Sequence, residues 1–211
     1  MVIWDLKKNK SVLVHKFSEK EAPLDVSFLN DIVVDVRNEF AFITDSGLPV
    51  NSSDKNTYGG LIVFDLKRKE SRRVLSLDPT TLHDPTLWIE IHGRKVLPEE
   101  PMRTGADGIA LSRDSESLYW CPLTSHSLFR LNTTLLRDFG TTQQKLSQSV
   151  ERVLEDRGTA SDGLACDNAG SLFLTSLEGN AITVGKLPSL VRISRLVHDD
   201  ERLHWPDTIG F

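Results

Sequence analysis

The hydrophobic residues of this chain fall in short runs that recur in the same surroundings. One run follows an acidic residue, Asp31, and a second run at 40–44 comes after a polar turn. Short apolar runs separated by polar turns are typical of β-hairpins, and self-similarity along a chain is typical of repeat folds. The later copies of the run begin at Asp107, Asp162 and Asp207.

A second pair of apolar runs completes each unit. In the first copy these runs are 60–66 and 72–75, separated by the charged turn 67–70. The pattern therefore predicts four antiparallel strands per unit. The opening residues resemble this second pair, so we expect the chain to begin halfway through one unit and to end at the start of another.

Four-stranded antiparallel units that repeat in a chain predict an all-β fold, a β-propeller, in which each blade buries its faces against its neighbours. About three and a half blades are expected here. Because a propeller needs at least about four blades, we expect an incomplete propeller; a short chain closed by dimerisation is the alternative. The expected divisions are a half blade at 1–30, blades at 31–104, 105–158 and 159–204, and the start of a further blade at 205–211.

The spacing of the units predicts insertions. The acidic residues at 31, 107, 162 and 207 are 76, 55 and 45 residues apart. We place the insertions of the first unit at 48–58 and at 78–104, with an extra hairpin around His92-Gly93-Arg94. The insertion of the second unit is expected to be short and helical, near 133–150. A capping box at 141–144 would start the helix, and Leu146, Val150, Val153 and Leu154 would form its apolar face.

Composition and charge exclude several classes of protein. The chain has 25 Lys and Arg against 30 Asp and Glu, a net charge of -5, so it lacks the basic excess of a nucleic-acid binder. No apolar run approaches the roughly 20 residues that span a membrane. Residues 1–6 do not form a signal peptide, which would leave the protein in the cytoplasm if the chain were complete.

The cysteines and the common catalytic motifs do not point to a particular activity. Cys121 and Cys166 stand in unrelated contexts, so no disulfide framework or CxxC site is predicted, although one disulfide remains open. The sequence has no Gly-rich phosphate loop, no nucleophile elbow and no HExxH motif. Kinase, classical serine hydrolase and zinc protease activities therefore have no support.

Several segments resemble the major royal jelly protein and Yellow family, and most closely its microbial members. The resemblance runs through nearly the whole chain in a consistent order. It implies a six-bladed propeller, usually secreted, of which this chain is the middle portion. The segments that carry it are 60–66, 106–112, 118–130, 161–165, 177–182 and 203–208.

The resemblance implies three functions from different classes. Members of the family include proteins of melanin-pathway chemistry, proteins that bind biogenic amines, and nutrient or storage proteins. The first expectation is a propeller that binds a small organic ligand in its central channel. The alternatives are a divalent-cation-dependent lactonase or hydrolase, like the related gluconolactonase and regucalcin propellers, and a structural or storage protein without catalysis.

The candidate site residues are the acidic residues that begin successive blades. By the resemblance, Asp107 and Asp162 match the position at which the gluconolactonase-like propellers hold a cation, and Asp207 is the next in the series. Radial repetition should bring these residues to one channel mouth. Calcium or magnesium would suit such oxygen ligands better than zinc. Asp107 and Asp162, with Asn180, are also the expected ligand-binding residues. The alternative is that these aspartates cap strand starts beside a glycine.

His126 is the remaining candidate for chemistry. A single histidine could serve as a base, but a loop or packing role is the alternative when no partner is identified. No catalytic residue is assigned from the sequence. The expected partners are a small molecule, with neither nucleic acid nor membrane, and the oligomeric state is left open.

Overall fold

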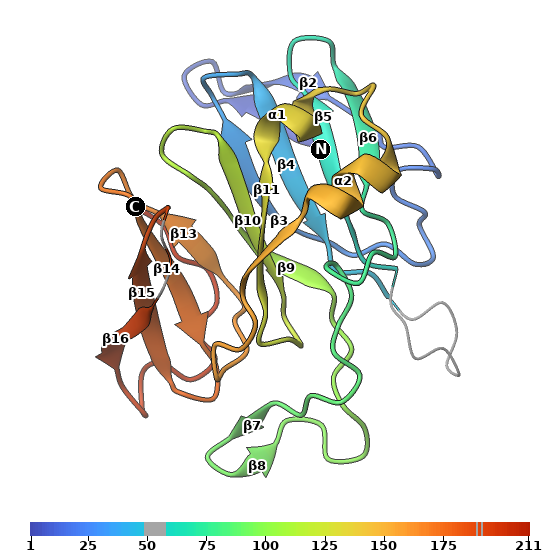
Figure 1. Cartoon of the computed structure of the whole chain (residues 1–211). Helices are drawn as coiled ribbons and strands as arrows, with labels where there is room; N and C mark the ends of the chain where they lie inside the picture. Colours follow the sequence, from blue (N-terminus) through green and yellow to red (C-terminus); the bar gives the residue numbers. More distant parts are fainter. Residues whose placement is uncertain (49–57, 189, 191) are drawn as a thin grey trace.

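The strands form three four-stranded antiparallel sheets arranged as an arc, in a computed structural model that describes residues 1–48, 58–188, 190 and 192–211. The predicted all-β propeller architecture is confirmed (Figure 1). In each sheet the strands follow one another in chain order. The sheets comprise β3 (Leu29–Asp35), β4 (Phe40–Asp45), β5 (Gly60–Asp65) and β6 (Glu70–Val74); β9 (Ala106–Leu111), β10 (Ser117–Pro122), β11 (Leu128–Asn132) and β12 (Glu151–Leu154); and β13 (Leu164–Cys166), β14 (Ser171–Ser176), β15 (Ala181–Lys186) and β16 (Ile193–His198).

Two smaller hairpins stand beside these sheets. The opening hairpin pairs β1 (Val2–Asp5) with β2 (Lys10–Val14), as the pattern of the first residues predicts. The expected extra hairpin is also present, with β7 (Glu90–Ile91) paired to β8 (Arg94–Lys95). The other predicted insertion, at 48–58, lies outside the described residues for 49–57.

An aspartate at the end of a strand organises three of the hairpin turns. Asp65 accepts hydrogen bonds from the backbone N–H groups of Lys67 and Arg68, and Lys69 then adopts a φ of 60°. Asp5 makes the same contacts with Lys7 and Lys8 in the turn that leads to β2. Asp35 accepts from the backbone N–H and the side-chain amide of Asn38 in the turn that leads to β4. Asx turns of this kind reverse the chain locally. The sequence therefore specifies where each hairpin turns.

The faces of neighbouring sheets bury the core. Phe42 and Leu61 from the first sheet pack in one cluster with Leu118 and Trp120 from the second. A second cluster joins Tyr119 and its neighbours to the β13–β16 sheet. Each sheet thus depends on the next one for the burial of its apolar side chains, as expected for propeller blades.

Two short helices, α1 (Thr133–Arg137) and α2 (Gln143–Ser149), occupy the predicted helical insertion. The predicted capping box at 141–144 is wrong, because Thr142 is the N-cap and its side chain accepts from the N–H of Lys145. The Thr141 hydroxyl instead donates to Asp138. The predicted apolar face also ends early, since Val153 lies in β12. Leu136 and Leu146 bury the helices against the first core cluster.

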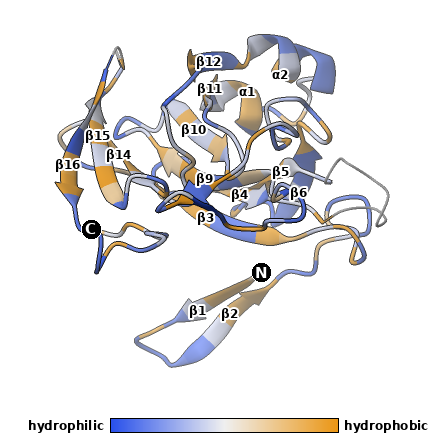
Figure 2. Cartoon of the chain, turned by 90° about the horizontal axis from the view of Figure 1, so that it is seen from below, coloured by the Kyte–Doolittle hydropathy of each residue, from blue (hydrophilic) through white to orange (hydrophobic). Residues whose placement is uncertain are grey.

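The two ends of the arc leave apolar side chains exposed. On the β1–β2 hairpin, which stands apart from the sheets in Figure 2, Trp4 and Val14 are exposed. Ile32 and Val34 of β3 and Leu196 of β16 are exposed as well. The sheets therefore form an open arc, as the count of blades predicts. Among the described residues, no helix is both long and apolar enough to cross a membrane.

Candidate functional site

The first strands of successive sheets, β3, β9 and β13, lie side by side at the centre of the arc. Glycines make this approach possible. A Cβ atom on Gly163 would lie 2.1 Å from the backbone oxygen of Asp207, and one on Gly108 would lie 2.8 Å from that of Asp162. The glycine after each aspartate is therefore required because neighbouring backbones touch there. The repeat places the blade starts around one axis.

Asp107 and Asp162 meet at this point as a buried pair. Their exposed fractions are 3% and 9%. The side chain of Asn30 donates to Oδ1 of Asp107 at 2.6 Å, and the indole N–H of Trp205 donates to Oδ2 of Asp162 at 2.5 Å. The two carboxyl groups also interact with each other, while their shared role in binding a ligand or cation stays a prediction.

Both carboxyl groups of the pair have raised pKa values. Burial raises the pKa of Asp107 to about 8, with the carboxylates of Asp162 and Asp207 adding to the effect. A hydrogen bond between the two carboxyl groups also favours the protonated form of Asp107. Burial raises the pKa of Asp162 as well, against the opposing effect of the Trp205 hydrogen bond. Two carboxylates this close resist simultaneous ionisation unless a positive charge joins them.

Asp31 and Asp207 add further negative charge beside the buried pair. Asp31 is half-buried, which raises its pKa although backbone N–H groups of Ile32 and Ile109 oppose the shift. Asp207 is exposed, and its Oδ1 accepts from the hydroxyl of Thr208 at 3.1 Å. Within the described ranges, no lysine, arginine or histidine forms an ion pair with any of these four aspartates. The mouth is acidic without an internal counter-charge.

A cavity of about 250 Å³ lies among the first strands. Among the described residues, Asp31 is its one charged wall residue. Ile109, Leu164 and Ile209 contribute aliphatic side chains, and Thr208 contributes a hydroxyl. Ile109 and Leu164 each follow an aspartate of the buried pair by two residues, so the cavity wall begins beside the pair in the chain.

The oxygen-rich mouth matches the chemistry of a hard cation only in part. Carboxylate oxygens are the ligands that calcium and magnesium prefer. However, Asp107 and Asp162 each already accept an N–H donor, and the part of the chain that the structure describes holds no group of three or more His, Cys, Asp or Glu side chains able to hold a metal ion. The cation site formed by Asp107, Asp162 and Asp207 stays a prediction.

Asn180 is not brought into contact with the aspartate pair. Its side chain is 2% exposed, and its amide nitrogen lies 3.0 Å from Oδ1 of Asp200 and 3.3 Å from Nε2 of His92. His92 belongs to the turn between β7 and β8. Asn180 therefore joins the inserted hairpin to the loop after β16. Its role in ligand binding stays a prediction.

His126 has partners that the sequence did not reveal. Its Nδ1 lies 3.0 Å from Asp156, and its Nε2 lies 3.7 Å from Glu178. The nearby carboxylate of Glu178 raises the pKa of His126, although burial opposes it, and Asp156 adds to the rise. These groups come from three different loops, 30 and 52 residues from His126 in the chain. No local spacing signals such a group, and Asn30 was missed for the same reason.

The comparisons with known proteins agree with this fold. The family described as Major royal jelly protein matches residues 1–210. No curated protein matches the sequence. Solved structures with similar folds include a gluconolactonase from Xanthomonas campestris (TM-score 0.54, 15% identity, 92% of this chain and 53% of that one) and the calcium-binding protein regucalcin from Agrobacterium tumefaciens (TM-score 0.56, 13% identity, 92% and 52%). The Nidogen/Laminin complex also matches, at a TM-score of 0.54 and 14% identity, over 92% and 54%.

These identities support the fold alone. This chain spans about half the length of each of these structures.

Proposed function

Since this chain belongs to the major royal jelly protein family, we propose that it binds a small, positively charged organic ligand at the centre of its propeller. The observation that carries the proposal is the buried pair of Asp107 and Asp162, which has no cationic partner among the described residues and lies two residues before Ile109 and Leu164 in the wall of a cavity. A cationic head group between the two carboxyl groups would relieve their repulsion.

The cavity favours an amine with an apolar body. At about 250 Å³ it is slightly smaller than the roughly 300–1,000 Å³ of typical ligand pockets, so it suits a ligand of modest size. The walls from Ile109 and Leu164 would contact the apolar part of such a ligand, and Asp31 would face its polar end. The indole of Trp205, fixed by its bond to Asp162, stands next to the head group position.

The test compares matched probes by isothermal titration calorimetry. Phenethylamine and 3-phenylpropionate share an apolar ring and differ in the sign of their charge. We expect the chain to bind the amine and not the carboxylate, and we expect Asp107→Asn and Asp162→Asn to weaken amine binding by about tenfold or more. Glu99→Gln removes one exposed negative charge elsewhere and is the control. Equal affinity for both probes, or amine binding that survives both substitutions, would contradict the proposal.

A divalent-cation-dependent lactonase is the second candidate. It is favoured by the carboxylate oxygens of Asp107 and Asp162 and by the likeness to a gluconolactonase and to a calcium-binding protein. Calcium or magnesium would be held by these two residues with Asp207, and a bound cation supplies Lewis acidity toward a carbonyl oxygen. Calcium should then raise the melting temperature of the chain, and gluconolactone hydrolysis should depend on calcium.

The two experiments separate the candidates. Amine binding without a calcium effect supports the ligand-binding protein, and calcium-dependent hydrolysis supports the lactonase. A chain that responds to neither probe would leave the structural or storage role that the family also includes. By membership of the family we propose that the protein acts outside the cell.

A further inference from the structure

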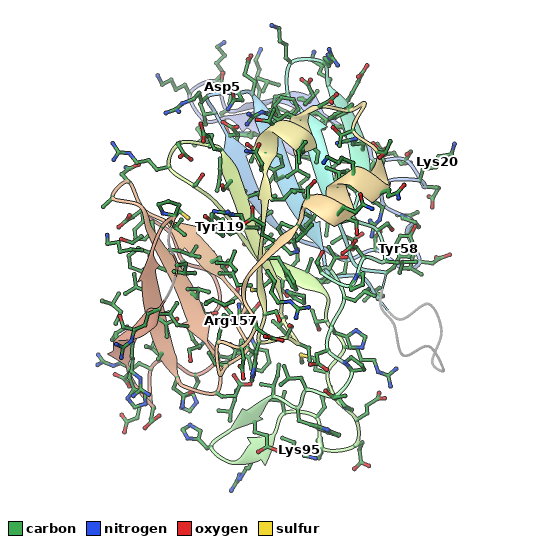
Figure 3. All side chains as sticks on the ribbon, viewed as in Figure 1. Asp5, Lys20, Tyr58, Lys95, Tyr119 and Arg157 are labelled. Atoms are coloured by element: carbon green, nitrogen blue, oxygen red, sulfur yellow. The ribbon has the colours of Figure 1, made fainter. Side chains whose placement is uncertain are left out.

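Arg157 is a buried cation that forms no ion pair in the part of the chain that the structure describes. It lies in the loop between β12 and β13, where the two C-terminal sheets meet (Figure 3). Only 9% of the residue is exposed, and no carboxylate forms an ion pair with its guanidinium among the described residues. Its Nη2 donates to the backbone oxygen of Ser125 at 2.8 Å, but Nε and Nη1 are buried without any hydrogen-bond partner.

The guanidinium of Arg157 stays positively charged although it is buried. An arginine stays protonated in proteins, and burying a charge without a partner is costly. The thiol of Cys121 lies beside the guanidinium, but burial raises the pKa of that thiol, so it remains neutral. Asp156 is the nearest carboxylate in sequence and interacts with the charge of Arg157, but its side chain is 70% exposed and bonds to His126 and to the N–H of Gly158. The charge of Arg157 is therefore balanced only weakly among the described residues.

A cavity of about 340 Å³ adjoins Arg157. The same cavity is lined by Arg195 of β16, Thr183 of β15 and Glu178 of the β14–β15 turn. Ile193, two residues before Arg195, packs in one cluster with Val153 of β12. The residues that line the cavity come from the β12–β13 loop and from the third sheet, and none of them lines the cavity beside Asp31.

The single carboxylate in this cavity does not oppose an anion. Oε2 of Glu178 accepts from the hydroxyl of Thr159 at 2.6 Å and from the N–H of Ala160 at 2.8 Å, and Oε1 faces His126 at 3.7 Å. Its charge is thus already matched by these neighbours. Arg157 and Arg195 leave an excess of positive charge in the walls.

We propose that this cavity between the β12–β13 loop and the third sheet binds a small oxyanion, a carboxylate or a phosphate group, with Arg157 as its buried counter-charge and Arg195 at the rim. Arginine is the side chain best suited to both groups, because its N–H donors bind carboxylate and phosphate oxygens with charge-assisted hydrogen bonds. The site is independent of the proposed channel ligand.

The experiment titrates the full chain with inorganic phosphate and, separately, with acetate, by calorimetry at constant ionic strength. The anion that binds more tightly identifies the chemical source. We expect Arg157→Gln to weaken that binding by about 30-fold or more, because it removes the buried partner of the anion. Arg195→Gln, at an exposed position that leaves folding intact, should weaken it by a smaller factor. Arg68→Gln, on the distant β5–β6 turn, removes the same charge and should leave it unchanged.

Three results would overturn the proposal. The first is the absence of saturable binding of either anion. The second is equal weakening by Arg68→Gln and Arg195→Gln, which would indicate nonspecific attraction to positive charge. The third is unchanged binding in Arg157→Gln. If Arg157→Gln fails to fold, the comparison of Arg195→Gln with Arg68→Gln decides the matter.

Discussion

The guanidinium of Arg73 lies 2.6 Å from the carboxylate of Asp45, and only 5% and 0% of the two side chains are exposed. Asp45 ends β4 and Arg73 lies in β6, so the pair spans the strand between them. Asp45 also accepts from the N–H groups of Phe28 and Gly47, and Arg73 donates to the backbone oxygen of Glu21. One buried ion pair thus anchors the segment that leads into the first complete sheet.

Removing one member of this pair should destabilise the chain strongly. Asp45→Asn leaves the Arg73 charge buried without its partner, and we expect a loss of about 3–5 kcal/mol in the free energy of unfolding. Urea denaturation measures the change. The control is Arg68→Gln, whose side chain is 67% exposed and lies 3.8 Å from Asp65, and it should change stability by less than about 1 kcal/mol. Similar losses in both variants would argue against a special role for the buried pair.

The four tryptophans allow a test of the core between sheets. Trp120 is fully buried, stacks on Phe129 and donates to the backbone oxygen of Thr80 at 2.8 Å. Trp120→Ala should lower the free energy of unfolding by about 3–5 kcal/mol. Trp4→Ala removes the same side chain from the exposed β1–β2 hairpin, and a change within about 0.5 kcal/mol is expected. Thermal and urea unfolding of both variants check the difference, and equal effects would place the core elsewhere.

The close approach of the blade starts can be tested with an alanine. In Gly163→Ala the new Cβ would meet the backbone of Asp207, and the clash should cost about 1–3 kcal/mol of stability. Gly210→Ala is the matched control, because nothing lies within 4 Å of its added Cβ. Circular dichroism melts compare the two. If Gly163→Ala melts like the unmodified chain, the inner strands are not packed as closely as described.

The ion pair of His126 and Glu178 predicts a pH window of stability. The raised pKa of His126 gives stability that is complete below the ordinary value of 6.5 and is lost as the pH rises through the raised value. Burial opposes ionisation of Glu178, but the nearby imidazole of His126 and the hydrogen bond from Thr159 lower its pKa, so its contribution is complete above 4.5 and is lost as the pH falls through the lowered value.

Both contributions are therefore complete between pH 4.5 and 6.5. We expect the melting temperature of His126→Gln to fall furthest below that of the unmodified chain in this window, and the gap to narrow on the alkaline side. Melts at pH values from about 4 to about 9 measure the gap. A gap that does not vary with pH would show that His126 acts only by packing.

Much of the fold was predictable because its signals are local. The alternation of apolar runs and polar turns identified the hairpins, and the aspartates that organise the turns, such as Asp65, lie within three residues of the N–H groups they bind. The repeat placed Asp107 and Asp162 at equivalent positions. The helix was located correctly, but its cap was not, because the Thr141 hydroxyl bonds to Asp138 instead.

The sequence by itself determined that the chain is a repeat of antiparallel hairpins whose acidic starts face one axis. Only the tertiary structure decided which groups complete each site. Trp205 donates to Asp162 from 43 residues away, Asn30 donates to Asp107 from 77 residues away, and Arg157 is buried beside a thiol that lies on another strand. Such contacts depend on how whole sheets pack, because burial and the distances between loops are not encoded in the spacing of neighbouring residues. The physical character of both proposed sites, a buried acidic pair and a buried unpaired cation, arises from that packing.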